Sequence, residues 1–142
     1  MSNLQADEKL IERIEEALGE ADKLKTGIEA ALETGFFRSA MARAAKQIST
    51  EIGNQAIFGS IDVKTLRDFA ENLARAADSE CRRICIQDEY GIGPPRTEEV
   101  YSETGSELLV LRSLALVLAD RINAVRWLLD ARRIAAELLE SC

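Results

Sequence analysis

Apolar residues recur at helical spacing along most of the chain, and the longest such segment runs from Leu108 to Leu139 without a glycine or a proline. A segment that is apolar on several sides over this length predicts one long helix surrounded by other helices. Three earlier segments supply the expected partners: Leu4 to Leu32, Phe37 to Ile52 and Val63 to Ile84. The pattern therefore predicts an all-α protein with helices at about residues 4–33, 36–57, 62–89 and 107–140.

The first predicted helix carries a broad apolar stripe made of three rows at seven-residue spacing. The rows are Leu4, Ile11, Leu18, Lys25 and Leu32; Ile14, Ala21 and Ile28; and Leu10, Ala17, Leu24 and Ala31. Because a two-stranded coiled coil uses two rows, this width predicts a helix that faces at least two neighbours. Gly19 and Gly27 each cost about 1 kcal/mol relative to Ala inside a helix. The rows run through both glycines, so we expect one continuous helix.

Turn and capping residues predict the boundaries between these helices. Gly35 can take the left-handed conformation that commonly ends a helix. Ser60 or Asp62 can cap the third helix, and Ser106 can cap the last one. Residues 91–105 contain both prolines of the chain and lack helical spacing in their first half, so we expect a loop there.

These elements predict one domain over residues 1–142, folded as an antiparallel four-helix bundle with long helices. The C-terminal helix is expected to be central, because some of its apolar residues lie away from its main row. The residues away from the row are Leu109, Leu116 and Trp127, and the main row is Leu111, Leu118 and Val125. If three partners within the chain leave this helix uncovered, a homodimer is the simplest way to cover it.

Net charge narrows the classes of partner. The chain has 18 Lys and Arg against 25 Asp and Glu, a net charge of −7, which disfavours direct binding to nucleic acid or to an anionic membrane. The apolar run from Leu108 to Ala119 is shorter than the roughly 20 residues that span a membrane. The N-terminal residues lack the basic and apolar regions of a secretory signal, so we expect a cytoplasmic protein. Because of the negative net charge, we expect its partner to be a protein.

Candidate chemistry is sparse. The chain has no histidine, which excludes Ser-His and Cys-His nucleophile pairs, and we expect no catalytic site, cofactor or metal. An acidic cluster at Glu12, Glu15 and Glu16 is typical of a solvated helix face. Cys81 and Cys85 are four residues apart on the predicted third helix and share a face there, and Cys142 is the remaining thiol. Free thiols are the expected state, with metal or intermolecular disulfide chemistry as the alternative.

Two places are candidates for binding a partner. One is the loop, where a Pro-Pro-Arg sequence and a nearby tyrosine can form a docking segment, although a plain connector is the simpler interpretation. The other is the last helix, where Arg112, Arg126 and Arg133 lie at multiples of seven and Trp127 lies at the edge of the core. The candidate partner-binding residues are Pro94, Pro95, Arg96, Tyr101, Arg126, Trp127 and Arg133.

Taken together, these features favour a non-catalytic helical module for protein–protein interaction, such as an adaptor, a chaperone or a regulatory subunit. An alternative is a small acidic inhibitor of a nucleic-acid-handling complex, in the manner of phage anti-CRISPR proteins. A second alternative is a DNA-binding regulator that uses the ridge formed by Arg112, Arg126 and Arg133 on the last helix. A contiguous acidic surface on the first helix would distinguish the inhibitor from the other two.

Overall fold

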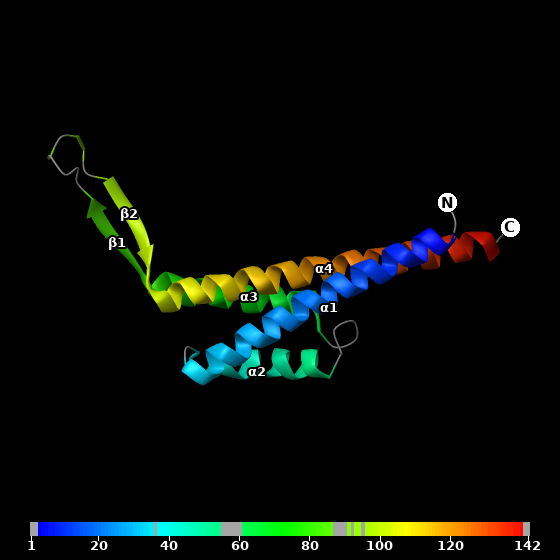
Figure 1. Cartoon of the computed structure of the whole chain (residues 1–142), viewed down its shortest axis with the longest axis horizontal. Coiled ribbons are helices and arrows are strands. Elements are labelled where there is room, and N and C mark those ends of the chain that lie inside the picture. Colours follow the sequence, from blue (N-terminus) through cyan, green and yellow to red (C-terminus); the bar gives the residue numbers. More distant parts are fainter. Residues whose placement is uncertain are drawn as a thin grey trace.

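The computed structural model describes residues 3–35, 37–54, 61–86, 91, 93–94 and 96–140, with side chains except at 3–6, 81–86 and 96–99. The elements in chain order are α1 (Asn3–Thr34), α2 (Ser39–Gly53), α3 (Val63–Ser79), β1 (Cys81–Ile86), β2 (Arg96–Tyr101) and α4 (Glu103–Glu140). Four helices form the body and a two-stranded hairpin projects from one end of it (Figure 1). The predicted helical class is therefore confirmed for the body.

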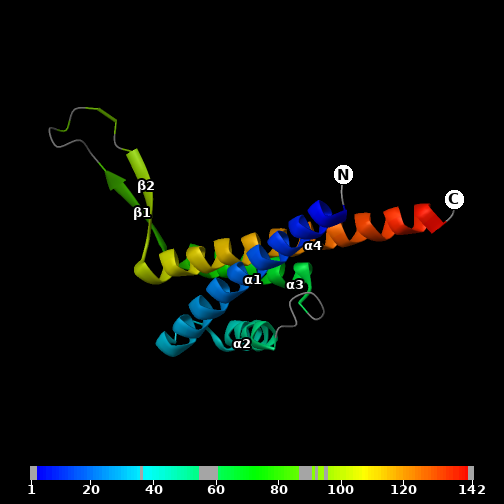
Figure 2. The same ribbon diagram turned by 45° about the vertical axis from the view of Figure 1, so that its right-hand side comes forward.

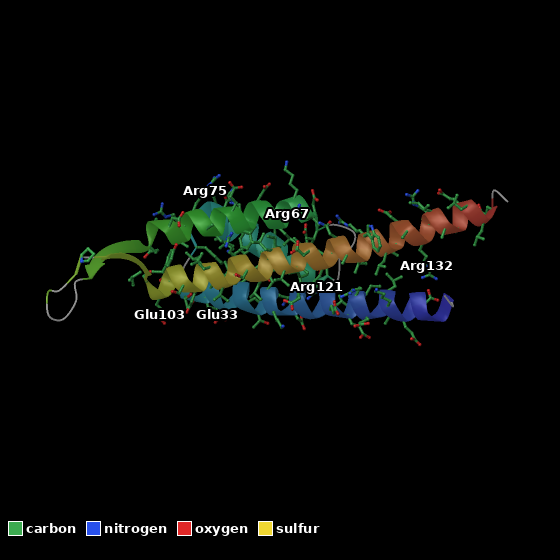
Figure 3. The ribbon with its side chains drawn as sticks, turned by 90° about the horizontal axis from the view of Figure 1, so that it is seen from above. Glu33, Arg67, Arg75, Glu103, Arg121 and Arg132 are labelled. Atoms are coloured by element: carbon green, nitrogen blue, oxygen red, sulfur yellow. The ribbon has the colours of Figure 1, made fainter. Side chains whose placement is uncertain are left out.

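Helix α4 is the element on which both α1 and α3 pack. Helix α1 runs antiparallel to it, because Arg132 pairs with Asp7 at 2.6 Å while Arg121 pairs with Glu16 at 3.4 Å. The N-terminal and C-terminal ends of the chain consequently lie at the same end of the molecule (Figure 1). Arg67 of α3 pairs with Asp120 of α4 at 4.0 Å on the opposite side (Figure 3).

The core consists of apolar side chains from all four helices. Each helix contributes at least one of the largest fully buried side chains, and the segment before α3 contributes another. These side chains are Leu24, Ile28, Ile48, Ile61, Leu66, Leu73, Leu118, Ile122 and Val125. Full burial of one such side chain contributes about 1.5–3 kcal/mol. Apolar burial on α4 is therefore the main term that holds α1 and α3 in place.

Two local predictions about the helices are confirmed. Helix α1 is continuous through Gly19 and Gly27. At Gly27 an added Cβ would lie 2.7 Å from Cδ2 of Leu111, so the missing side chain lets α1 approach α4 closely. Gly35 has a φ of 73° and ends α1 in the left-handed conformation.

The end of the predicted third helix and part of the predicted loop are wrong. Helix α3 ends at Ser79, well short of residue 89, and the chain then enters β1. Strand β1 pairs antiparallel with β2, with Cys81 opposite Tyr101 and Ile86 opposite Arg96. Within residues 91–105, β2 and the start of α4 replace the expected loop. The predicted helical residues 87–89 lie outside the described residues.

Long-range pairing explains this difference. Two isoleucines in β1, and a threonine, a valine and a tyrosine in β2, suit a strand. Helical spacing of a few apolar residues cannot reveal that a second strand will pair with them. The N–H of Glu80 donates to the carbonyl of Ala77 at 3.0 Å, and the carbonyl of Glu80 accepts from the N–H of Ser102 at 3.1 Å. These bonds end α3 and hold the two ends of the hairpin together.

Ser102, rather than the predicted Ser106, caps the last helix. Its hydroxyl accepts a hydrogen bond from the N–H of Gly105 at 3.1 Å and donates to the carboxylate of Glu80 at 3.1 Å. The capping prediction for α3 is confirmed at Asp62, whose carboxylate accepts from the N–H of Lys64 at 3.2 Å. Helix α4 therefore begins four residues earlier than predicted, at Glu103.

Helices α2 and α3 are much shorter than α1 and α4, so they cover only one half of the α1–α4 pair (Figure 2). At the other half Ile11 is 55% exposed and Leu18 is 41% exposed, although both belong to the predicted apolar stripe. Residues 129–140 of α4 are all exposed. The expectation that the whole stripe of α1 faces neighbours is wrong for this end of the chain.

We expect Gly19→Ala to raise the free energy of unfolding by about 0.5–1 kcal/mol, because Gly19 lies inside a helix and nothing lies within 4 Å of an added Cβ. Urea unfolding followed by circular dichroism would measure the change. Gly35→Ala is the matched control and should lower stability by about 1 kcal/mol, since its φ of 73° strains any other residue. A stability loss for Gly19→Ala would contradict the continuous helix.

Candidate interaction surface

The ends of α1 and α4 form a two-helix extension, called here the terminal arm, which comprises residues 3–18 and 125–140. Its own core is small: Leu10, Ala17 and Val125 are buried, and Ile14 and Leu128 pack partly buried against them. The guanidinium of Arg126 donates to the carbonyl of Ile61 at 3.2 Å, which marks where the segment leading into α3 meets α4. Beyond this point α1 is the only helix beside α4 among the residues that the structure describes (Figure 2).

One face of α4 carries a line of apolar residues away from the core. Leu109, Leu116, Trp127 and Ile134 make up this line, called here the outer stripe. The spacings between them are seven, eleven and seven residues, and each spacing returns a helix to within about 20° of the same direction. Leu118, fully buried, is nine residues from Leu109 and from Trp127, so it points in the opposite direction.

The outer stripe is more exposed on the terminal arm than in the first half of α4. Leu109 and Leu116 pack partly buried against the core. Trp127 is 69% exposed and Ile134 is 49% exposed. In the view down onto α4, α1 and α3 lie on its two sides and leave the face between them without a helix (Figure 3). Leu138 continues this apolar surface and is 63% exposed.

Several of the arginines on α4 bind groups of the same chain. Arg126 donates to the carbonyl of Ile61, and Arg133 lies 3.5 Å from Glu137 and 4.0 Å from Asp130. Arg121 and Arg132 pair with carboxylates of α1 (Figure 3). Exposed pairs of this kind contribute about 0.2–1 kcal/mol each. They position side chains more than they stabilise the fold.

Arg112 differs from the other arginines of α4. It is partly buried, and among the residues that the structure describes no carboxylate pairs with it. Asp130 lies on the same flank of the outer stripe, farther along α4, and is 68% exposed at its side chain. Arg112, which no described carboxylate pairs with, and Asp130, which lies 4.0 Å from Arg133, are therefore a cation and an anion beside the same apolar line.

The structure separates the predicted partner-binding residues into two places. Pro94 is exposed between the strands, Arg96 begins β2 and Tyr101 ends it, at the start of α4. Arg126, Trp127 and Arg133 lie on the other half of α4, beyond its middle. From Glu103 to Trp127 the rise of a helix is about 36 Å, so the two places do not form one site. Pro95 lies outside the described residues.

Sequence reasoning missed a groove of about 500 Å³ between α2, α3 and the start of α4. Met41, Phe69 and Leu108 contribute apolar lining, and Arg38 and Arg75 contribute charge. Phe69 of this lining also makes an edge-to-face contact with Phe37, with ring centroids 6.4 Å apart. The spacing of Phe37 and Phe69 along the chain carries no signal of that contact.

The alternative of metal chemistry at Cys81 and Cys85 rested on a shared helix turn that the structure does not contain. Cys81 and Cys85 lie in β1, so the shared helix turn is wrong, and Cys142 lies outside the described residues. Where the chain is described, no group of three or more Cys, Asp or Glu side chains is arranged to hold a metal ion. Glu16, from the acidic cluster, instead pairs with Arg13 at 3.0 Å and with Arg121.

Comparisons with protein-family models, with curated proteins and with solved structures found no match for this chain. Of the helices described above, none combines the length and the apolar character needed to cross a membrane.

We expect Trp127→Ala to change the free energy of unfolding by less than about 0.5 kcal/mol in dilute solution, because its side chain is largely exposed. Leu118→Ala, by contrast, should cost about 2–5 kcal/mol, since Leu118 is fully buried on the opposite side of the same helix. Urea unfolding monitored by circular dichroism would compare them. Equal losses for the two variants would contradict the assignment of inner and outer faces.

Proposed function

We propose that this protein is a non-catalytic helical module for protein–protein interaction, acting as an adaptor, a chaperone or a regulatory subunit. The observation that carries the proposal is the exposure of Trp127 and Ile134 on a helix face opposite the core. Tryptophan is enriched among the residues that dominate binding energy, and clustered exposed apolar residues typically mark interaction sites. The outer stripe is the docking surface in this proposal.

The architecture supports such a role. We infer that the helices form an antiparallel four-helix bundle, because α1 and α3 both pack on α4 in registers that run opposite to it. A rigid scaffold of this kind presents side chains at defined positions with little ordering cost on binding. A reducing, cytoplasmic setting is supported by the odd number of cysteines, 3 in the chain.

A second candidate function is the acidic inhibitor of a nucleic-acid-handling complex. Glu8, Glu12, Glu15 and Asp22 are all exposed, and their spacing places them along one side of α1. Carboxylates aligned in this way can occupy a basic channel that normally holds nucleic acid. The DNA-binding alternative has less support, because Arg126 and Arg133 are engaged by groups of their own chain.

An affinity capture from lysate of the source organism would test the proposal. We expect a stoichiometric protein partner that survives nuclease and high salt, that is lost with Trp127→Ala and that is retained with the double variant Glu12→Gln, Glu15→Gln. The reason is that apolar contacts are insensitive to salt, whereas exposed charge pairs are screened.

The opposite pattern would support the second candidate. A partner that is released by salt and lost with the Glu12, Glu15 double variant, while Trp127→Ala still captures it, would assign binding to the acidic side of α1. The two variants are matched because each alters exposed side chains and leaves the buried core unchanged.

A further inference from the structure

We propose that the outer stripe binds a second copy of this chain, with the two α4 helices side by side and antiparallel. This inference rests on the proposed function, because it takes the outer stripe as the docking surface and names the partner. The spacing within the outer stripe favours a second copy of the chain as the partner. Its intervals of seven, eleven and seven residues are the same when counted from either end. A two-fold axis requires this property, since residue i then contacts j while j contacts i.

The palindromic spacing sets the register of the two helices. Leu109 lies opposite the partner's Ile134, and Leu116 lies opposite the partner's Trp127, with the axis between residues 121 and 122. Each contact occurs twice in the dimer. The more buried end of one stripe thereby covers the more exposed end of the other, so that Trp127, 69% exposed in one copy, packs on a leucine that the core already holds in place.

Charge complementarity selects the antiparallel orientation. Arg112 follows Leu109 by three residues and Asp130 follows Trp127 by three residues, so the two lie on the same flank of the outer stripe. In the antiparallel register Arg112 lies next to the partner's Asp130, within one residue along the axis. A parallel pair would instead turn this flank of one helix toward the opposite flank of the other, so that Arg112 and Asp130 would not meet. Contact between the opposite charges favours the antiparallel orientation.

The centre of the stripe is polar and fits the same register. Asp120 and Asn123 occupy the gap between Leu116 and Trp127, and the axis places Asp120 opposite the partner's Asn123. An amide can donate a hydrogen bond to a carboxylate, and a polar residue in an apolar helix interface commonly specifies its register. Asp120 is 78% exposed in one copy, with Arg67 4.0 Å away.

The rest of the molecule leaves room for this arrangement. None of the described helices lies over the face of α4 between α1 and α3 (Figure 3). The hairpin projects from the end of the body where α4 begins, away from α2 (Figure 1). In the antiparallel register, this is the end at which the partner's terminal arm lies. The hairpin therefore stands next to the partner's α4 rather than across the outer stripe.

Light scattering after gel filtration and sedimentation equilibrium on the full chain would test the proposal. We expect a mass of twice the 15.7 kDa chain at high concentration. Trp127 is the single tryptophan, so its fluorescence should shift to the blue as the dimer forms. Arg112→Glu and Asp130→Arg should each raise the dimer dissociation constant by about tenfold or more, and the combined variant should restore it to within about threefold of the parent value.

Matched variants separate a failure to associate from a failure to fold. Arg43→Glu makes the same charge change on exposed α2 and should leave the dissociation constant unchanged. Trp127→Glu should give a folded monomer by circular dichroism, and Leu116→Glu should lower both stability and assembly. A dimer that tolerates both single charge reversals, or that the double variant does not restore, would overturn the antiparallel register.

The outcome also separates this inference from the proposed function. If the protein stays monomeric at every concentration, yet captures a different protein through Trp127, the proposed dimer is wrong. The proposed function as an interaction module is then still supported. A monomer that captures nothing through Trp127 overturns both. A dimer with the predicted charge rescue supports both.

Discussion

The buried face of α4 is the constraint on which the rest of the structure depends. Leu111, Leu118 and Val125 on this face are almost fully buried, and both α1 and α3 pack on the helix that carries them. Burial of these side chains contributes far more than the exposed ion pairs that accompany it. The ion pairs at Arg121 and Arg132 align α1 with α4, but the apolar face brings the two helices together.

Because the helices differ in length, part of the apolar surface of the two long helices is left exposed. Helices α1 and α4 continue well past the ends of α2 and α3, so the same apolar periodicity that is buried in one half of the molecule is exposed in the other. Ile11 and Leu18 on α1, together with Trp127 and Ile134 on α4, are the residues affected. Clustered exposed apolar residues often mark interaction sites, and the proposed function rests on this property.

The hairpin shows how a short local signal can mislead. The apolar residues near Ile84 fit the continuation of a helix, yet the segment pairs with β2 through contacts about fifteen residues apart in sequence. The capping of α4 by Ser102 follows from the same change, because Glu80 bonds to Ser102 across the base of the hairpin. The prediction of a loop failed within residues 96–105 for this reason, and Arg96 and Tyr101 became the two ends of strand β2.

The sequence by itself determined the four helical segments, the inner row of α4 and the end of α1 at Gly35, because periodicity and capping are local properties of a chain. It also marked Leu109, Leu116 and Trp127 as lying off the main row of α4. Only the tertiary structure decided which apolar faces are covered, how close α1 approaches α4 at Gly27, and that Arg112 finds no carboxylate among the described residues. Those features depend on where distant segments end relative to one another, and helical spacing carries no information about that.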